Sequence, residues 1–413
     1  MTEDLIDFSL PENESSIIKV IGVGGGGGNA VNYMYQKGIK DVDFVICNTD
    51  AQALENSMVP VKIQLGESLT EGRGAGNKPE RGEQSAIENL EDINELLAEN
   101  TKMVFITAGM GGGTGTGAAP VIAKAAKDLG VLTVGIVTIP FRFEGRQRLK
   151  QAFEGINRLK ENVDSLLVIN NEKLSEIYGD LKLSSAFSKA DDVLSTAAKG
   201  IAEIITLHGY INVDFEDVKT VMTDSGVAVM GSANAEGENR AVNAIKEALT
   251  SPLLNSNDVR GARNILLNIT SGGEEVTMDE VGQITDYVQE AVGDSASIIW
   301  GTGQDTALND KVSVTIIATG FDNGNISEDD PSKSTFQARR VQNNISNQSR
   351  LNLKEEQNDS QNILEQKLIL TNLKDTEIDE IESIPAFKRK QKILEKSQFQ
   401  SGNVIKFTLD EEE

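Results

Sequence analysis

Two glycine-rich runs constrain the fold of this chain more than any other feature, because each lies between an apolar segment and a helix-like segment. The first run, GGGGG at 24–28, follows SIIKVIGV, and the second, GMGGGTGTGAA at 109–119, follows MVFITA. A strand that enters a glycine loop and leaves as a helix is the repeating unit of a parallel α/β sheet. The free backbone N–H groups and the dipole at such a helix N-terminus favour an anion such as phosphate.

The same alternation continues through the first half of the chain. Apolar segments predict buried strands at 16–23, 42–47, 59–65, 103–108, 131–138 and 165–169, and apolar stripes predict helices at 29–37, 80–99 and 146–162. The helix after the second glycine loop is expected to carry Pro120 in its first turn. This pattern predicts a Rossmann-type parallel sheet covered on both faces. An Ala-rich helix at 184–207 is apolar on more than one side, which suits a helix between two domains.

Composition excludes several classes of protein. With 413 residues, 38% of them hydrophobic, the chain can build two domains with sizeable cores. The single Cys47 excludes a disulfide framework, and the single His208 excludes His-based metal sites and Ser-His triads. The N-terminus resembles no signal peptide and no membrane-spanning run is present, so we expect a cytoplasmic protein. Residues 322–413 hold 18 acidic and 13 basic side chains, so most of the net charge of −25 lies in 1–321 and disfavours nucleic-acid binding.

The composition changes at Asp322, and the segment that follows is rich in Asn, Gln, Ser and charged residues. It predicts a disordered linker that leads to an apolar-basic peptide, ESIPAFKRK, which is typical of a tethered binding motif. A frayed chain end is the alternative. The last residues, VIKFTLDEEE, have no partner that the sequence identifies. The expected boundaries are 1–15 (disordered), 16–183 (nucleotide-binding domain), 184–219 (central helix and following loop), 220–320 (second α/β domain), 321–381 (linker), 382–390 (binding peptide) and 391–413 (C-terminal extension).

The glycine runs leave two kinds of nucleotide chemistry open. Gly22, Gly24 and Gly27 satisfy the dinucleotide fingerprint, with Asp50 at the distance of a ribose-binding acid, so a nicotinamide-dependent oxidoreductase is one hypothesis. The second run lacks the lysine of a P-loop. Its backbone amides, with the hydroxyls of Thr114 and Thr116, would have to cradle the phosphates instead. Two such loops at neighbouring strand ends can hold a triphosphate between them.

The GGGTGTG heptad at 111–117 resembles the signature of the tubulin/FtsZ superfamily, and further blocks resemble its bacterial FtsZ family. These blocks stand in the family's order: GVGGGGGNAV, NTDAQAL, GAGNKPE, FEGRQR, NVDFEDV and IPAF. The resemblance covers about residues 16–320 and the terminal peptide. It implies a tubulin-like fold with a GTP-binding domain, a long central helix and an activating C-terminal domain. In GAGNKPE, Asn77 and Lys78 depart from the family pattern, which leaves open whether Lys78 contacts phosphate or solvent.

The resemblance also implies which residues hold GTP or GDP. Glu144 would bind ribose and Arg148 phosphate or ribose, although their spacing also fits a local ion pair. Asn171 would contact base and ribose, Asp192 would accept from N1–H and N2–H of guanine, and Phe187 would stack on the base unless it is a core aromatic. The full expected set is Gly24, Gly25, Gly26, Asn29, Asp50, Ala75, Gly76, Gly111, Gly112, Gly113, Thr114, Gly115, Thr116, Gly117, Glu144, Arg148, Asn171, Phe187 and Asp192.

The NVDFEDV block supplies two carboxylates, Asp214 and Asp217, which can share one face or simply cap the next helix. The predicted central helix is about 36 Å long, so it would hold them far from a nucleotide at its start. The resemblance implies that Asn212, Asp214 and Asp217 enter the nucleotide site of the next subunit in a head-to-tail filament. Hydrolysis would then need positioning and charge neutralisation, with Mg²⁺ present. A scaffold that assembles without hydrolysing GTP is the non-enzyme alternative.

The resemblance therefore implies a self-polymerising GTPase of the bacterial division ring at mid-cell. The resemblance implies that residues 382–390 bind an FtsA-like membrane-tether adaptor and that other division proteins also bind the chain. Direct membrane insertion is not expected, because the sequence has neither an amphipathic helix of that kind nor a lipidation signal.

Overall fold

The computed structural model describes residues 16–39, 41–178, 182–206, 211, 213–250, 259–293 and 295–321. His208, Asn212 and the segments predicted as the disordered N-terminus, linker, binding peptide and C-terminal extension lie outside these residues, except for Phe321. In the described part of the chain, no helix is long and apolar enough to cross a membrane.

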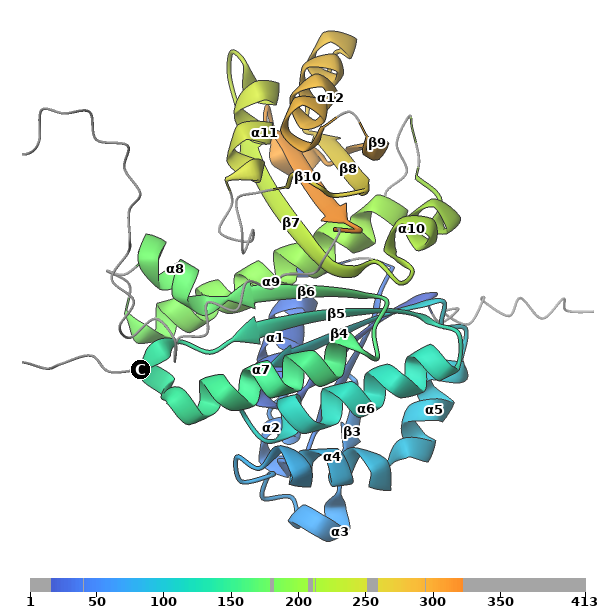
Figure 1. Cartoon of the computed structure of the whole chain (residues 1–413), viewed down its shortest axis with the longest axis vertical. Helices are drawn as coiled ribbons and strands as arrows, with labels where there is room; N and C mark the ends of the chain where they lie inside the picture. The colour runs from blue at the N-terminus through green and yellow to red at the C-terminus, as the bar shows by residue number, and fades with distance from the viewer. Residues whose placement is uncertain are drawn as a thin grey trace, which may run out of the picture. The chain divides into compact units, whose positions relative to one another are not determined.

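Ten described strands form one sheet. They are β1 Ile18–Val23, β2 Asp43–Asn48, β3 Val61–Gln64, β4 Met103–Gly109, β5 Leu132–Ile139, β6 Ser165–Asn170, β7 Gly226–Ala235, β8 Asn264–Ser271, β9 Ser297–Gln304 and β10 Val312–Thr319. Their order is β3-β2-β1-β4-β5-β6-β7-β10-β8-β9 (Figure 1). The first seven in this order are parallel, whereas β10 is antiparallel to β7 and β8. The predicted α/β class with a mainly parallel sheet is confirmed.

The described helices cover both faces of the sheet. They are α1 Gly24–Lys37, α2 Ala51–Glu55, α3 Glu67–Thr70, α4 Pro79–Glu88, α5 Leu90–Ala98, α6 Thr114–Asp128, α7 Arg146–Lys160, α8 Asn171–Tyr178, α9 Leu183–Thr206, α10 Phe215–Met222, α11 Arg240–Leu249 and α12 Met278–Val292. On β4, Val104 and Ile106 pack in the core beneath α4 to α7, while Met103 and Phe105 pack in the core beneath α1, α9 and α10. Burial on both faces explains why this strand is apolar without alternation.

Helix α9 joins the two parts of the sheet. Its buried residues, among them Leu194 and Ile201, belong to the same apolar cluster as Met230 of β7, Leu266 of β8 and Ile317 of β10. The same cluster contains core residues of β1, β4, β5 and β6. The helix is therefore packed against both the parallel and the antiparallel region, which accounts for apolar residues on several of its sides.

Several predicted element bounds are wrong, and the late starts of α1 and α6 have a shared cause. Helix α1 begins at Gly24 rather than near Asn29, and α6 begins at Thr114, so Pro120 lies in its second turn rather than its first. The predicted helix at 80–99 is two helices that meet at Asn89, and α8 was not predicted. Glycine has a low helix propensity, so a propensity argument places the start of a glycine-led helix too late.

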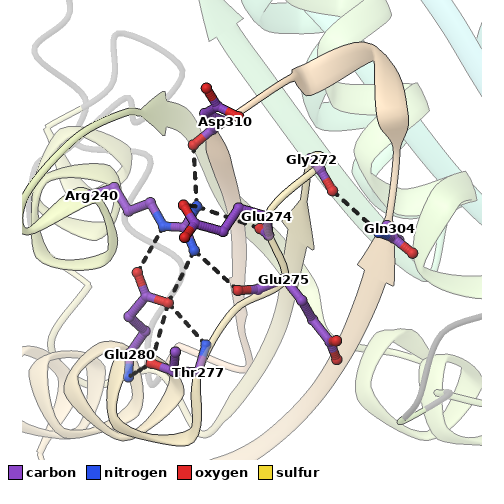
Figure 2. Close-up of polar contacts among 8 residues, drawn as sticks. All are labelled: Arg240, Gly272, Glu274, Glu275, Thr277, Glu280, Gln304 and Asp310. Carbon is purple, nitrogen blue, oxygen red and sulfur yellow. Dashed lines mark hydrogen bonds and ion pairs between the residues drawn. The ribbon is translucent and has the colours of Figure 1, made fainter.

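The region after β7 has its own core, in which α11 and α12 pack on one face of β7, β10, β8 and β9. A buried guanidinium ties its connections together. Arg240 is 6% exposed and donates from Nε to Glu280 Oε1 at 2.7 Å (Figure 2). Its Nη groups donate to backbone carbonyls of Glu274, Glu275 and Asp310. The hydrogen bond from Arg240 lowers the pKa of Glu280, which also closes a capping box with Thr277 at the start of α12.

Replacing Arg240 by Met should therefore lower the free energy of unfolding of this region by about 3 kcal/mol, because it leaves the Glu280 carboxylate and three carbonyls without their shared donor. Urea unfolding followed by the fluorescence of Trp300 measures the change. The matched control is Lys311→Met, which removes an exposed 3.8 Å ion pair to Glu236 and should cost no more than about 0.5 kcal/mol. Equal midpoint shifts for the two variants would contradict this account.

Candidate nucleotide-binding site

The two glycine runs meet at the carboxyl edge of the parallel sheet. Strands β1 and β4 are neighbours in register, with Val23 beside Ala108, so the loops that follow them lie next to each other. Gly24 has a φ of +71°, and a Cβ on it would lie 2.8 Å from the backbone nitrogen of Gly115. The contact between the loops therefore requires a glycine at position 24.

Both helices that leave these loops begin without a side-chain cap. Neither α1 nor α6 has a side-chain hydrogen bond at its N-cap, and neither carries an acidic residue in its first turn. A Cβ placed on Gly25 or on Gly112 would meet no atom within 4 Å. Two helix N-termini with open space beside the glycine backbone and no carboxylate of their own form a favourable site for a multiply charged anion.

The two threonines of the second loop have different local roles. Thr114 is buried, and its Oγ1 lies 2.7 Å from Oγ1 of Thr49, the first residue after β2. The Thr116 hydroxyl accepts a hydrogen bond from the N–H of Gly111 at 2.9 Å. Thr116 therefore shapes the loop, and its hydroxyl proton is still available as a donor.

The GAGNKPE segment closes over the second loop. A Cβ on Gly113 would lie 2.8 Å from Cβ of Ala75 and 3.0 Å from the backbone nitrogen of Lys78, so the two backbones are in close contact. Ala75 is buried, while Gly76, Asn77 and Lys78 are exposed. The structure thus brings Ala75 and Gly76 to the loop of Gly111–Gly117.

Asp50 performs a local task at this edge. Its Oδ1 accepts hydrogen bonds from the backbone nitrogens of Gln52 and Ala53, and it caps α2. The fingerprint acid of the dinucleotide hypothesis is therefore engaged with its own helix. Gly26 and Asn29 lie on α1, where Asn29 is exposed.

Glu144 and Arg148 form the local ion pair that their spacing permits. Arg148 Nη1 lies 2.8 Å from Glu144 Oε2, while Glu144 Oε1 accepts from the N–H of Phe141. Phe187 is 41% exposed, and its ring meets the edge of Phe141 with centroids 5.4 Å apart. Phe187 is thus a partly exposed aromatic packed against Phe141 rather than a fully buried core residue.

Asn171 and Asp192 differ in the hydrogen-bond partners of their side-chain oxygens. Asn171 is 5% exposed, and its buried Oδ1 has no hydrogen-bond partner. Asp192 accepts from Tyr33 OH and from Lys189 Nζ, both at 2.9 Å. Burial opposes ionisation of Asp192, but these hydrogen bonds outweigh it and its pKa is lowered. Burial raises the pKa of the neighbouring Asp191 to about 6, so Asp191 takes up a proton in mildly acidic solution while the hydrogen-bonded Asp192 keeps its charge.

The acids of NVDFEDV do not join these residues. Asp214 caps α10 by accepting from the N–H of Asp217 at 2.8 Å, so the capping alternative describes their local contacts. Asp224, just after α10, pairs with Lys127 at the end of α6, and Lys127 also pairs with Asp164, just before β6. The ion pairs of Lys127 therefore place the end of α10 at the amino edge of the sheet, opposite the edge of the glycine loops. Figure 1 shows α9 running from the α8 end of the molecule to α10 at the other.

Sequence reasoning missed Thr49, Tyr33 and Lys189. Thr49 lies within the NTDAQAL block, two residues after the strand predicted at 42–47, so its position near a strand end was a usable signal. Tyr33 reaches Asp192 from a helix 159 positions earlier, and no sequence spacing indicates such a contact.

The fold and this edge of the sheet define a member of the tubulin/FtsZ class of GTPases. The family model described as the Tubulin/FtsZ family GTPase domain matches residues 17–179, and the model described as the FtsZ family C-terminal domain matches 226–322. The chain belongs to the FtsZ family. The predicted recognition, the tubulin-like fold and GTPase activity are confirmed, which sets aside both the nicotinamide oxidoreductase and the scaffold that does not hydrolyse GTP.

Relatives of this family cover most of the chain. A protein named Cell division protein FtsZ from Azotobacter vinelandii is 52% identical over 317 residues, which are 76% of this chain and 80% of that protein. Another of the same name, from Porphyromonas gingivalis, is 50% identical over 78% of this chain and 71% of its own length. The solved structure of an empty FtsZ dimer from M. jannaschii is 44% identical, has a TM-score of 0.70, and is matched over 74% of this chain and 88% of its own.

Replacing Asn171 by Ala should weaken GDP binding about tenfold, since the free acceptor at Oδ1 has no other group to bond. Because that atom makes no bond in the free protein, the urea midpoint should not fall. Titration with a fluorescent GDP analogue measures the affinity. Asn162→Ala is the control, because the Asn162 side chain donates to the carbonyl of Arg158 near the opposite edge, and it should leave affinity unchanged. Unaltered affinity in Asn171→Ala would remove Asn171 from the site.

Proposed function

We propose that this chain binds GTP between its two glycine loops and hydrolyses it only when a second subunit docks head-to-tail, as the polymerising protein of a bacterial division ring. The observation that carries the proposal is the pair of uncapped helix N-termini, α1 and α6, in contact at Gly24 and Gly115. Together they supply two sets of free N–H groups to one triphosphate and remove the need for a P-loop lysine.

Most of the remaining site residues have a defined task in this proposal. The loop of Gly111–Gly117 holds the phosphates, while Ala75 and Gly76 cover the terminal phosphate. Glu144 and Arg148 exchange their ion pair for contacts with ribose and phosphate. Asp192, charged and already oriented by Tyr33 and Lys189, accepts from guanine N1–H and N2–H, a pair of donors that adenine lacks. Asn171 contacts base and ribose through its free Oδ1, and Phe187 stacks on the base.

Magnesium would enter with the nucleotide. The described residues include no group of three His, Cys, Asp or Glu side chains that could hold a metal, so this part of the chain does not provide a preformed cage. This fits Mg²⁺, which takes phosphate and water oxygens as most of its ligands. Its chemistry would be to neutralise phosphate charge.

Catalysis in trans follows from the separation of the two half-sites. The nucleotide residues lie at the carboxyl edge of the sheet and at the start of α9, and Asp214 and Asp217 follow its far end, about 36 Å along a 24-residue helix. A head-to-tail neighbour would bring them to the terminal phosphate, where their carboxylates orient the attacking water and Asn212 adds a polar contact. The M. jannaschii structure is of an FtsZ dimer, which supports self-assembly, and a heterologous contact of the proposed kind builds open filaments.

The rest of the chain connects the filament to the cell. In this proposal 16–183 is the GTP-binding domain, 184–219 the central helix and catalytic loop, and 220–320 the activating domain. Residues 321–381 form the linker, and the peptide 382–390 binds an FtsA-like membrane tether at the mid-cell division site in the cytoplasm. The name of the relatives from Azotobacter vinelandii and Porphyromonas gingivalis, Cell division protein FtsZ, supports this placement.

Asp214→Asn tests the role of the acid without removing the cap of α10, since Asn caps a helix as well as Asp does. We expect GTP binding and assembly to be retained while turnover per subunit falls at least about 100-fold. Phosphate release and light scattering measure the two properties. Glu216→Gln, in the first turn of the same helix, is the control and should retain turnover. Undiminished turnover in Asp214→Asn would remove Asp214 from the mechanism.

Deleting residues 382–390 should leave assembly intact and abolish binding to the tether. The deletion removes the apolar Ile384, Ala386 and Phe387 together with three basic residues, and touches none of the described core. Co-sedimentation of filaments with a purified FtsA-like protein measures the binding, and replacing 360–368 by a Gly-Ser stretch of equal length is the control. An unchanged affinity after the deletion would refute this assignment.

A further inference from the structure

A cavity of about 950 Å³ lies between α12 and β9, away from the glycine loops. Its walls include Ile298 and Trp300 of β9, and Met278 and Val281 of α12, with Ile211 at one end. Met278 is 92% exposed and Ile211 is 43% exposed. An apolar groove of this size on the surface of the described domain marks a site for another segment of polypeptide.

One side of this groove is a sheet edge. Strand β9 is the outermost strand of the described sheet beyond β8. Ser297 donates its N–H inward to Arg263, and backbone groups in a strand alternate between its two neighbours. Those of Ile298 and Trp300 therefore point to the outer edge, as does the N–H of Thr302, which donates to the carbonyl of Ile211. The groove is lined by the side chains of Ile298 and Trp300 themselves. A strand added at this edge could therefore place every second side chain in the groove.

The C-terminal extension contains a segment that matches this edge. In VIKFTL, residues 404–409, the apolar Ile405, Phe407 and Leu409 alternate with Lys406 and Thr408, which is the pattern of a half-buried strand. We propose that residues 404–409 add to β9 as an antiparallel strand and place Ile405, Phe407 and Leu409 in the groove under α12. Main-chain bonds to a free edge give affinity in this mode of binding, and the pockets for alternate side chains give specificity.

The connection is long enough. The described chain ends at Phe321, just after β10, and Thr319 of β10 is in register with Asn264 of β8, which is in register with Ser297 of β9. The departure point is thus about 10 Å from the start of β9. Residues 322–403 number 82, with a random-coil reach of about 50 Å.

Charge selects the antiparallel direction. In that direction the acidic end, Asp410–Glu413, leaves at the Ser297 end of β9, beside the exposed basic residues Arg260 and Arg263. The parallel direction would bring the same four carboxylates to the other end of the groove, where Glu275 is part of the lining. Asp286 also lines the groove, but it lies midway along α12 and does not distinguish the two directions. Four like charges beside a carboxylate oppose binding, whereas the basic turn favours it.

The effect of this added strand on filament formation rests on the proposed function. Ile211 borders the groove and lies three residues before Asp214, on the face that a neighbouring subunit would meet. A strand added here covers that face, so the extension competes with the next subunit and raises the concentration at which filaments form.

The sole tryptophan of the sequence, Trp300, lies in the groove and reports its occupancy. In full-length, GDP-loaded protein at dilution, we expect Phe407→Asp to shift the emission of Trp300 to the red and increase its quenching by acrylamide. Thr408→Asp, on the opposite face of the added strand, should do neither. A synthetic peptide of residues 403–413, added in excess to the Phe407→Asp protein, should reverse both changes.

Identical emission from the wild type and both variants would overturn the proposal, because the groove would then be empty of the extension. Emission that instead changes with protein concentration, equally in all three, would assign the groove to a second copy and also overturn it. None of these readings requires GTP turnover, so they stand apart from the test on Asp214. As a second readout, Phe407→Asp should lower the threshold concentration for turnover, and an unchanged threshold would remove the competitive role.

Discussion

The contact between two helix N-termini at the edge of one sheet is the constraint on which the rest of this structure depends. Helices α1 and α6 start side by side because β1 and β4 are neighbours, and the backbone of Gly24 passes so close to Gly115 that a side chain has no room. Neither helix has a side-chain cap or a first-turn acid. The orphan N–H groups and the two dipoles are therefore left for a ligand, and only a strongly anionic one can satisfy both.

A second constraint is the length and burial of α9. The helix packs against the parallel strands on one part of its surface and against β7, β8 and β10 on another, so it holds the two regions of the sheet in one apolar cluster. Its start carries Phe187 and Asp192, and its end leads to Asp214. The same packing that joins the two regions of the sheet therefore separates the proposed nucleotide residues from the carboxylates, and a second subunit becomes part of the chemistry that we propose.

Much of the fold could be predicted from the sequence, because buried parallel strands are continuous apolar runs and their glycine loops are easily located. The starts of α1 and α6 could not, since glycine is a poor helix former and only the tertiary contact at Gly24 fixes the backbone there. At the site, the glycine loops and the Glu144–Arg148 pair follow from spacing within one segment. The contact of Tyr33 with Asp192 and the free Oδ1 of Asn171 depend on side-chain packing between distant elements, which periodicity does not encode.

The central claim is that the hydrolytic site spans two subunits. GTP turnover per subunit, measured against protein concentration with Mg²⁺ present, tests it most directly. We expect almost no turnover below a threshold concentration and a rate per subunit that rises above it, because the acids reach the nucleotide only after assembly. A rate per subunit that stays constant down to high dilution would mean a self-contained site and would contradict the claim.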